Sequence, residues 1–202
     1  MHQVNATRRY ESMRRATQAQ ETRADIAHAA RHLFVTRGWT ATTIRAVAEE
    51  AGVSVPTVYA TYGGKAGLAK ALVDAAALTA DRSRQQAELE AATNPAEQLA
   101  AMAAFDRRLF ERAGDMITLI REAGGDLAQL YTDARRDADD VRRQVFESWP
   151  SGTLRTDVPT AIDIYAALCT IDVYTTLTGE RGWSPDRVEQ WWQELLAREL
   201  LS

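Results

Sequence analysis

A short stretch from Thr42 to Lys65 carries small, polar and basic side chains at a spacing suited to contact with nucleic acid. Hydroxyls and cations can reach phosphate oxygens, and small apolar groups can pack against thymine methyls in the major groove. Arg45 is the long donor placed to reach a guanine O6/N7 pair, and Tyr59 can hydrogen-bond a phosphate or stack on a sugar. We predict contact with DNA at Thr43, Arg45, Ser54, Val55, Pro56, Thr57, Tyr59, Thr61 and Lys65.

Two short helices joined by a tight turn would have to position these side chains. Thr43 is a suitable N-cap for a helix ending near residue 50, and Ser54 is a suitable N-cap for a second helix over residues 55–61. The Ala51-Gly52-Val53 segment between them supplies a small residue and one that tolerates positive φ, as a helix-turn-helix requires. The N-terminal end of the second helix would then lie in the major groove.

Helical periodicity dominates the rest of the chain, so we expect an all-α fold. A first helix over residues 22–36, ended by Gly38, would pack on the helix-turn-helix, and a long fourth helix would run from about 65 to 90. The apolar residues expected to join these helices are Ile26, Ala30, Leu33, Phe34, Ile44, Val47, Ala48, Val53, Val58 and Tyr62. Further helices are predicted at about 95–112, 115–123, 126–148, 159–178 and 185–201, with one of the breaks at Gly114.

Residues 22–72 resemble the tetracycline-repressor-like (TetR) family of regulators. The resemblance rests on the segment from Thr42 to Ser54, on Pro56-Thr57-Val58-Tyr59 and on Tyr62-Gly63-Gly64-Lys65, preceded by Ala29 to Phe34 and Arg37-Gly38-Trp39. The family often has histidine where this chain has Thr61, and Tyr62 and Gly64 also depart from its usual residues. The resemblance implies a sequence-specific DNA-binding transcriptional regulator, in most cases a dimeric repressor, with a base-contacting arginine at Arg45.

The resemblance also implies a division of the chain. We expect a flexible basic tail over residues 1–21, a DNA-binding domain over 22–68, and a helical domain over 69–202 that binds a small-molecule effector and dimerises through its last two long helices. The apolar faces of the two predicted C-terminal helices fit a subunit interface, although both could pack inside one chain. These faces comprise Ile162, Tyr165, Ala166, Cys169 and Val173, and Val188, Trp191, Trp192, Leu195 and Leu196.

An effector pocket is expected among the helices between about residues 95 and 178. Apolar or amphipathic candidates to line it are Met102, Phe105, Met116, Tyr131, Tyr165 and Cys169, each of which could instead be plain core. No charged constellation singles out a class of effector. A regulator of the same fold that activates transcription, or that needs no ligand, is an alternative that the sequence does not separate.

The charge distribution agrees with a polyanionic partner at one end of the chain. Residues 1–65 hold nine Lys or Arg against five Asp or Glu, while the rest of the chain is acidic. Chance could also produce this asymmetry. The tail arginines, namely Arg8, Arg9, Arg14, Arg15 and Arg23, could add phosphate attraction or form a solvated leader.

Other kinds of chemistry find little support in the sequence. His28 and His32 have a chelating i, i+4 spacing but no third ligand nearby in the sequence, so we expect a surface helix and no metal site. Neither a phosphate loop nor a nucleophile elbow is present, so we expect no enzyme and no cofactor. The single cysteine and the absence of an apolar leader or membrane span favour a cytoplasmic protein.

Overall fold

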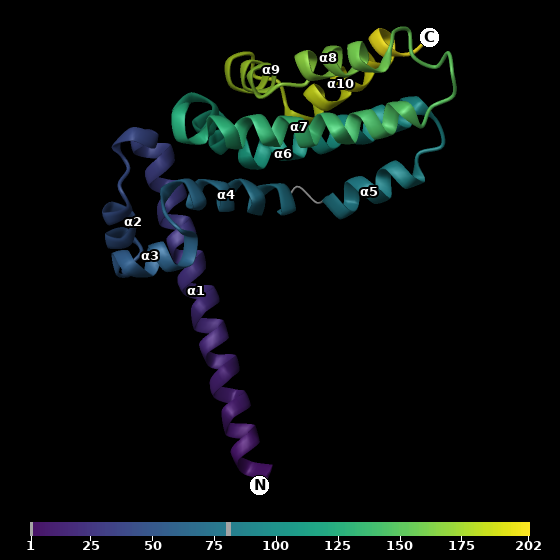
Figure 1. The fold of residues 1–202 in the computed structure, drawn as a ribbon. Coiled ribbons are helices and arrows are strands. Elements are labelled where there is room, and N and C mark those ends of the chain that lie inside the picture. The colour runs from purple at the N-terminus through teal and green to yellow at the C-terminus, as the bar shows by residue number, and fades with distance from the viewer. Residues whose placement is uncertain (1, 80–81) are drawn as a thin grey trace. The chain divides into compact units, whose positions relative to one another are not determined.

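The computed structural model describes residues 2–79 and 82–202, with the side chains of 2–12, 76–79, 82 and 126 outside the description. The chain divides into two compact units, an N-terminal unit (Met1–Leu72) and a C-terminal unit (Val73–Ser202). The described residues form helices and no strands, which confirms the all-α prediction (Figure 1). Each unit has its own buried apolar residues, so each is described separately below.

Three helices and the start of a fourth build the N-terminal unit. These are α1 (His2–Ala41), α2 (Ile44–Glu50), α3 (Val55–Tyr62) and the first part of α4 (Lys65–Thr79). The predicted apolar face of the first helix is buried at every position, together with Val47, Ala48 and Val58 from the next two helices. Burying these side chains fixes α2 and α3 against α1, because a helix of seven or eight residues has little stability of its own.

Helix α1 begins much earlier than the sequence analysis expects. Helical backbone starts at His2, not Thr22, so residues 2–21 extend the same helix where we expected a flexible tail. The side chains of residues 13–21 are all exposed. A polar segment without an apolar face gives no hydrophobic periodicity, which is why the sequence pattern did not predict a helix there. At its other end, Gly38 interrupts the helix with φ +77°, as expected.

Helix α6 (Pro95–Ala123) is the central element of the C-terminal unit. It packs against α5 (Arg82–Ala91), α7 (Gly125–Glu147), α9 (Ile171–Thr175) and α10 (Pro185–Leu200). The predicted break at Gly114 is wrong, because α6 runs through it. A Cβ at this position would lie 2.9 Å from the Ile171 Cδ1 atom, so glycine here permits close approach of α6 and α9 and does not end a helix.

Two other predicted helices are each described as more than one element. The helix predicted over 65–90 is described as α4 and α5, on either side of residues 80–81. The helix predicted over 159–178 is wrong as a single element: it comprises α8 (Val158–Leu168), α9 and a π-helical turn, η1 (Thr176–Glu180). Cys169 ends α8 with ψ +70°, and the Thr170 side chain accepts a hydrogen bond from the Val173 N–H to cap α9. The new N-cap therefore compensates the break in backbone hydrogen bonding.

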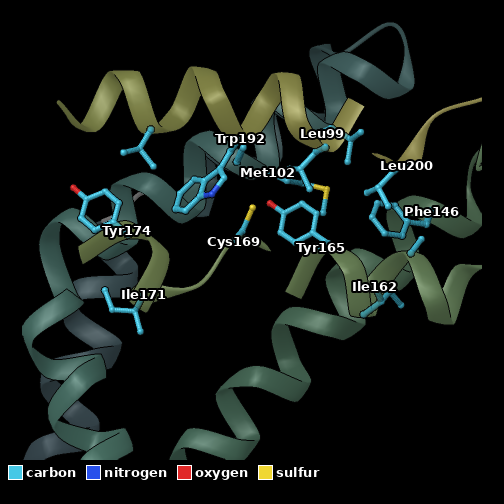
Figure 2. Close-up of a cluster of buried hydrophobic side chains, with 14 residues drawn as sticks. Leu99, Met102, Phe146, Ile162, Tyr165, Cys169, Ile171, Tyr174, Trp192 and Leu200 are labelled. Atoms are coloured by element: carbon cyan, nitrogen blue, oxygen red, sulfur yellow. The ribbon is translucent and has the colours of Figure 1, made fainter. Parts of the chain in front are cut away.

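A continuous apolar core joins α6, α7, α8, α9 and α10, and Figure 2 shows its central side chains. Most residues of the two apolar faces proposed above as a subunit interface are buried here within a single chain; only Val173 and Trp191 are half-buried. These faces therefore do not by themselves indicate dimerisation. The alternative, in which both faces pack inside one chain, explains the burial of most of these residues.

Candidate nucleic-acid interface

The start of α3 is fixed by two hydroxyl side chains. Ser54 is the N-cap, and its Oγ atom accepts a hydrogen bond from the Thr57 N–H at 3.3 Å. The hydroxyls of Ser54 and Thr57 also lie 2.7 Å apart, so one donates to the other. Val58 is fully buried and anchors the opposite side of the helix. The first turn of α3 is thus held by capping at one end and by packing behind it.

The outer face of α3 remains accessible in the N-terminal unit. Tyr59 has 53% of its surface exposed, Pro56 is exposed, and Val55 and Thr57 are half-buried. Thr61 is also half-buried, and its hydroxyl donates to the Thr57 carbonyl at 2.7 Å. Because its side chain is exposed, Tyr59 is not a core residue of this unit.

The start of α2 presents two further predicted contacts. Thr43 caps α2 by accepting a hydrogen bond from the Ala46 N–H at 3.1 Å, and its side chain is exposed. Arg45 is exposed in the first turn of the same helix. Beside them, the buried Thr42 hydroxyl lies 3.0 Å from the Leu33 carbonyl oxygen and 2.9 Å from that of Gly38. Thr42 therefore joins α2 to α1, a structural role that leaves Thr43 facing outward.

Lys65 has a partner that the sequence analysis did not predict. Its ammonium lies 4.2 Å from the centre of the Trp39 ring and donates a hydrogen bond to the Trp39 carbonyl. The ammonium is thus held at the start of α4 by a cation–π contact with the end of α1. The predicted phosphate contact of Lys65 would have to be made from this position.

Arg23 and Tyr62 form a second contact between α1 and the helix-turn-helix. The Tyr62 hydroxyl donates to the Arg23 carbonyl at 2.8 Å, and the Arg23 guanidinium lies 4.9 Å from the centre of the Tyr62 ring. Burial raises the pKa of the Tyr62 hydroxyl, so it remains a neutral donor. On the far side of Tyr62, a Cβ on Gly67 would lie 1.9 Å from the Tyr62 carbonyl oxygen, so only glycine fits there. The sequence alone could not pair residues so distant along the chain.

One of the two histidines with a chelating spacing has a carboxylate partner on another helix. His32 lies 2.5 Å from Glu50, so it joins α1 to the end of α2. Among the described residues, no three potential metal ligands gather at one place. Likewise, no helix in the part of the chain that the structure describes is both long and apolar enough to cross a bilayer.

The six candidate effector contacts are only partly brought together. Met102, Tyr165 and Cys169 lie in the core cluster of the C-terminal unit (Figure 2). Met116 is buried on α6 outside that cluster, and Phe105 and Tyr131 are half-buried. Burial raises the pKa of the Cys169 thiol, which is therefore a neutral core side chain.

Sequence reasoning missed a buried polar group beside this cluster. Asp106 accepts a hydrogen bond from the Tyr165 hydroxyl at 3.0 Å and lies 3.5 Å from the Arg142 guanidinium. That guanidinium also lies 4.5 Å from the centre of the Tyr165 ring and pairs with Asp139 at 2.6 Å. Nearby in the same core, the buried indole N–H of Trp192 has no hydrogen-bond partner among the described residues. Asp139 and Arg142 stand three residues apart on α7 and look like part of a solvated helix face in the sequence, so no signal distinguished these residues.

The class of protein follows from these elements: an all-helical chain whose N-terminal unit is a helix-turn-helix domain with an accessible second helix. Residues 26–72 match the family of bacterial regulatory proteins called tetR. The chain therefore carries a TetR-family DNA-binding domain, which confirms the resemblance inferred from the sequence.

Relatives and solved structures agree with this assignment. The transcriptional regulator TtgR of Pseudomonas putida is 40% identical over 78 residues, a segment that covers 39% of this chain and 37% of the relative. A transcriptional regulator of Saccharomonospora viridis, in complex with choline, has a TM-score of 0.70 at 21% identity, over 91% of this chain and 99% of that chain. FadR of Bacillus subtilis, in complex with stearoyl-CoA, has a TM-score of 0.70 at 17% identity, over 86% and 96%. The structural likeness extends the shared fold to the C-terminal unit.

Proposed function

We propose that this chain is a sequence-specific, DNA-binding transcriptional repressor that a small-molecule effector releases from a palindromic operator. The observation that carries the DNA-binding part is the exposed outer face of α3, with Thr57 and Tyr59 on a helix held from behind by Val58. A rigidly positioned helix with small and hydroxyl side chains can enter the major groove. The basic charge of residues 1–65 supplies the attraction to phosphates.

Sequence readout would be shared between α3 and the start of α2. Val55, Pro56 and Thr57 offer methyl and methylene groups to thymine, and the Thr57 hydroxyl can reach a base or a phosphate. Thr43 and Tyr59 can donate to phosphates and so fix the orientation of the domain, whereas Thr61 would have to give up its hydrogen bond to the Thr57 carbonyl to do the same. Arg45 is proposed to contact guanine.

Recognition of one genomic site requires more contacts than one short helix provides. Two copies of α3, about 34 Å apart or a multiple of that distance, would read the two halves of a palindrome. We therefore propose a homodimer. The proposal rests on the need for two DNA contacts and on the family assignment. The apolar faces of α8 and α10 do not add support, because they are largely covered within one chain.

The C-terminal unit is proposed to bind the effector. Structures of the same fold contain choline or stearoyl-CoA, which supports a ligand-binding role for this unit without indicating the ligand of this chain. Binding lowers operator affinity only if the effector prefers the conformation that does not fit the operator. Met102, Tyr165 and Cys169 are the candidate contacts that lie together.

The test begins with selection of duplexes from a randomised pool by the purified full-length protein. We expect enrichment of a palindrome, and repression of a reporter that carries it when the protein is present. Enrichment of no sequence would contradict DNA-sequence recognition. An increase in reporter output when the protein is present would replace the repressor with an activator of the same fold.

A further inference from the structure

The N-terminal part of α1 extends beyond the helices that it supports, as Figure 1 shows within the N-terminal unit. Every side chain from Met13 to Gln20 is exposed. A helical segment whose side chains are all exposed gains little stability from packing. These side chains are accessible to a binding partner.

The segment has two faces of different charge. With about 100° between successive helical residues, Arg15 and Arg23 lie about 80° apart on one side. Arg14, Glu21 and Asp25 lie within about 40° of one another on another side. The structure agrees with this register, because Arg14 and Glu21 line one shallow surface together with Met13, Thr17 and Gln18. Glu11 lies about 40° from Arg15, at the edge of the first side. That side is therefore mainly basic, and the side that bears Arg14 is mixed in charge.

The basic side adjoins the helix proposed to read DNA. Arg23 stacks on Tyr62, the last residue of α3, and accepts the Tyr62 hydroxyl hydrogen bond through its carbonyl oxygen. The face that carries Arg15 thus continues outward from the α3 end of the N-terminal unit. Arg8 stands seven residues before Arg15 in the same helix, although its side chain, like that of Arg9, lies outside the described residues.

We propose that this arginine face of α1, defined by Arg15 and Arg23, binds the phosphate backbone of duplex DNA that flanks the operator. At 1.5 Å per residue, Arg15 stands about 12 Å beyond Arg23 along the helix. With an axial rise of about 3.4 Å per base pair, a segment of that length spans at most about three to four base pairs outside the α3 contacts. The inference rests on the proposed DNA-binding function and makes the recognised site longer than the sequence that α3 reads.

A matched pair of variants tests whether the position of the charge on α1 matters, and not only the total charge of the protein. Arg15→Gln and Arg14→Gln each remove one positive charge from neighbouring exposed positions, but only Arg15 lies on the basic face. The full-length proteins are titrated, between about 50 and 200 mM salt, with a duplex selected by the wild type. One duplex keeps flanks of about one helical turn, and the other is cut at the operator edge.

On the flanked duplex, we expect Arg15→Gln to reduce the slope of log K against log salt by about 0.9 per protomer, since one phosphate contact is lost. Arg14→Gln should keep the wild-type slope, and on the trimmed duplex all three proteins should have the same slope. Equal slopes for the two variants on the flanked duplex would overturn the proposal while leaving operator binding intact. A wild-type protein that does not distinguish the selected duplex from a scrambled one would instead overturn the proposed function.

Discussion

The ammonium of Lys65 lies 4.2 Å from the centre of the Trp39 ring, so the first residue of α4 is held against the end of α1. The same ammonium donates to the Trp39 carbonyl. This contact joins the end of α1 to the start of α4 within the N-terminal unit. A movement of the start of α4 relative to α1 would strain or break it.

A double-mutant cycle should measure the coupling between these two residues. We expect Trp39→Leu and Lys65→Met to destabilise the N-terminal unit by amounts that do not add, with a coupling of about 0.5–1 kcal/mol. Opening free energies from amide hydrogen exchange of α2 and α3 in the full chain provide the measurement. Strictly additive effects would show that the stacked geometry contributes nothing.

Tyr59→Ala should weaken DNA binding without weakening the fold. Its side chain is exposed, so little packing is lost, whereas a hydrogen bond to a phosphate contributes about 1.5–3 kcal/mol, or at least about tenfold in affinity. Val35→Ala on α1 is the matched control, because Val35 is 52% exposed against 53% for Tyr59. Fluorescence-anisotropy titration of a labelled operator would distinguish them. Comparable losses in the two variants would exclude a specific role for the α3 face.

Gly114→Ala should destabilise the C-terminal unit by about 1–3 kcal/mol, because its Cβ would approach the Ile171 Cδ1 atom to 2.9 Å. Ile171→Val removes that carbon and should restore part of the loss in the double variant. Gly179→Ala is the control, since a Cβ there meets nothing within 4 Å. Urea unfolding of Gly114→Ala, Ile171→Val, the double variant and Gly179→Ala supplies the comparison. A double variant less stable than the sum of its single changes would contradict the steric explanation.

Asp106 should make the stability of the C-terminal unit depend on pH. Burial raises the pKa of its carboxyl in the folded state, although Arg142 and Tyr165 oppose the shift. A raised folded pKa gives a contribution that is present below the unfolded value, about 3.9, and is lost as pH rises through the folded value.

Asp106→Asn should remove that dependence. We expect the difference in unfolding free energy, wild type minus variant, to decrease as pH rises from about 3.9, since only the wild type must ionise a buried carboxyl. Urea unfolding over a pH series measures this difference. An increase with pH over the same range would mean that the pair with Arg142 outweighs desolvation.

The helix-turn-helix could be predicted because its signals are local. The caps at Thr43 and Ser54 and the turn at Gly52, which has φ +65°, each depend on residues within a few positions of one another. The outward position of Tyr59 follows from the buried Val58 beside it. Helix periodicity and capping rules therefore sufficed for the N-terminal unit.

Elements that depend on distant contacts could not be predicted in the same way. In the sequence, Gly114 looks like a helix break. The reason for a glycine there is the close approach of Ile171 on another helix, which the sequence does not show. The burial of Asp106 with Arg142 likewise depends on the packing of α6 against α7. The division near Thr170 did leave a signal, since a threonine before Ile171-Asp172 is a suitable N-cap, but the apolar run around it favoured one long helix.

The proposed function depends on recognition of a DNA sequence by the outer face of α3. The most direct measurement is the affinity of the full-length protein for its selected duplex relative to a scrambled duplex of the same length and composition, at one physiological salt concentration. We expect a ratio of about 10³ or more, which should decrease when Thr57 is replaced by valine. Equal affinities for the two duplexes would contradict it.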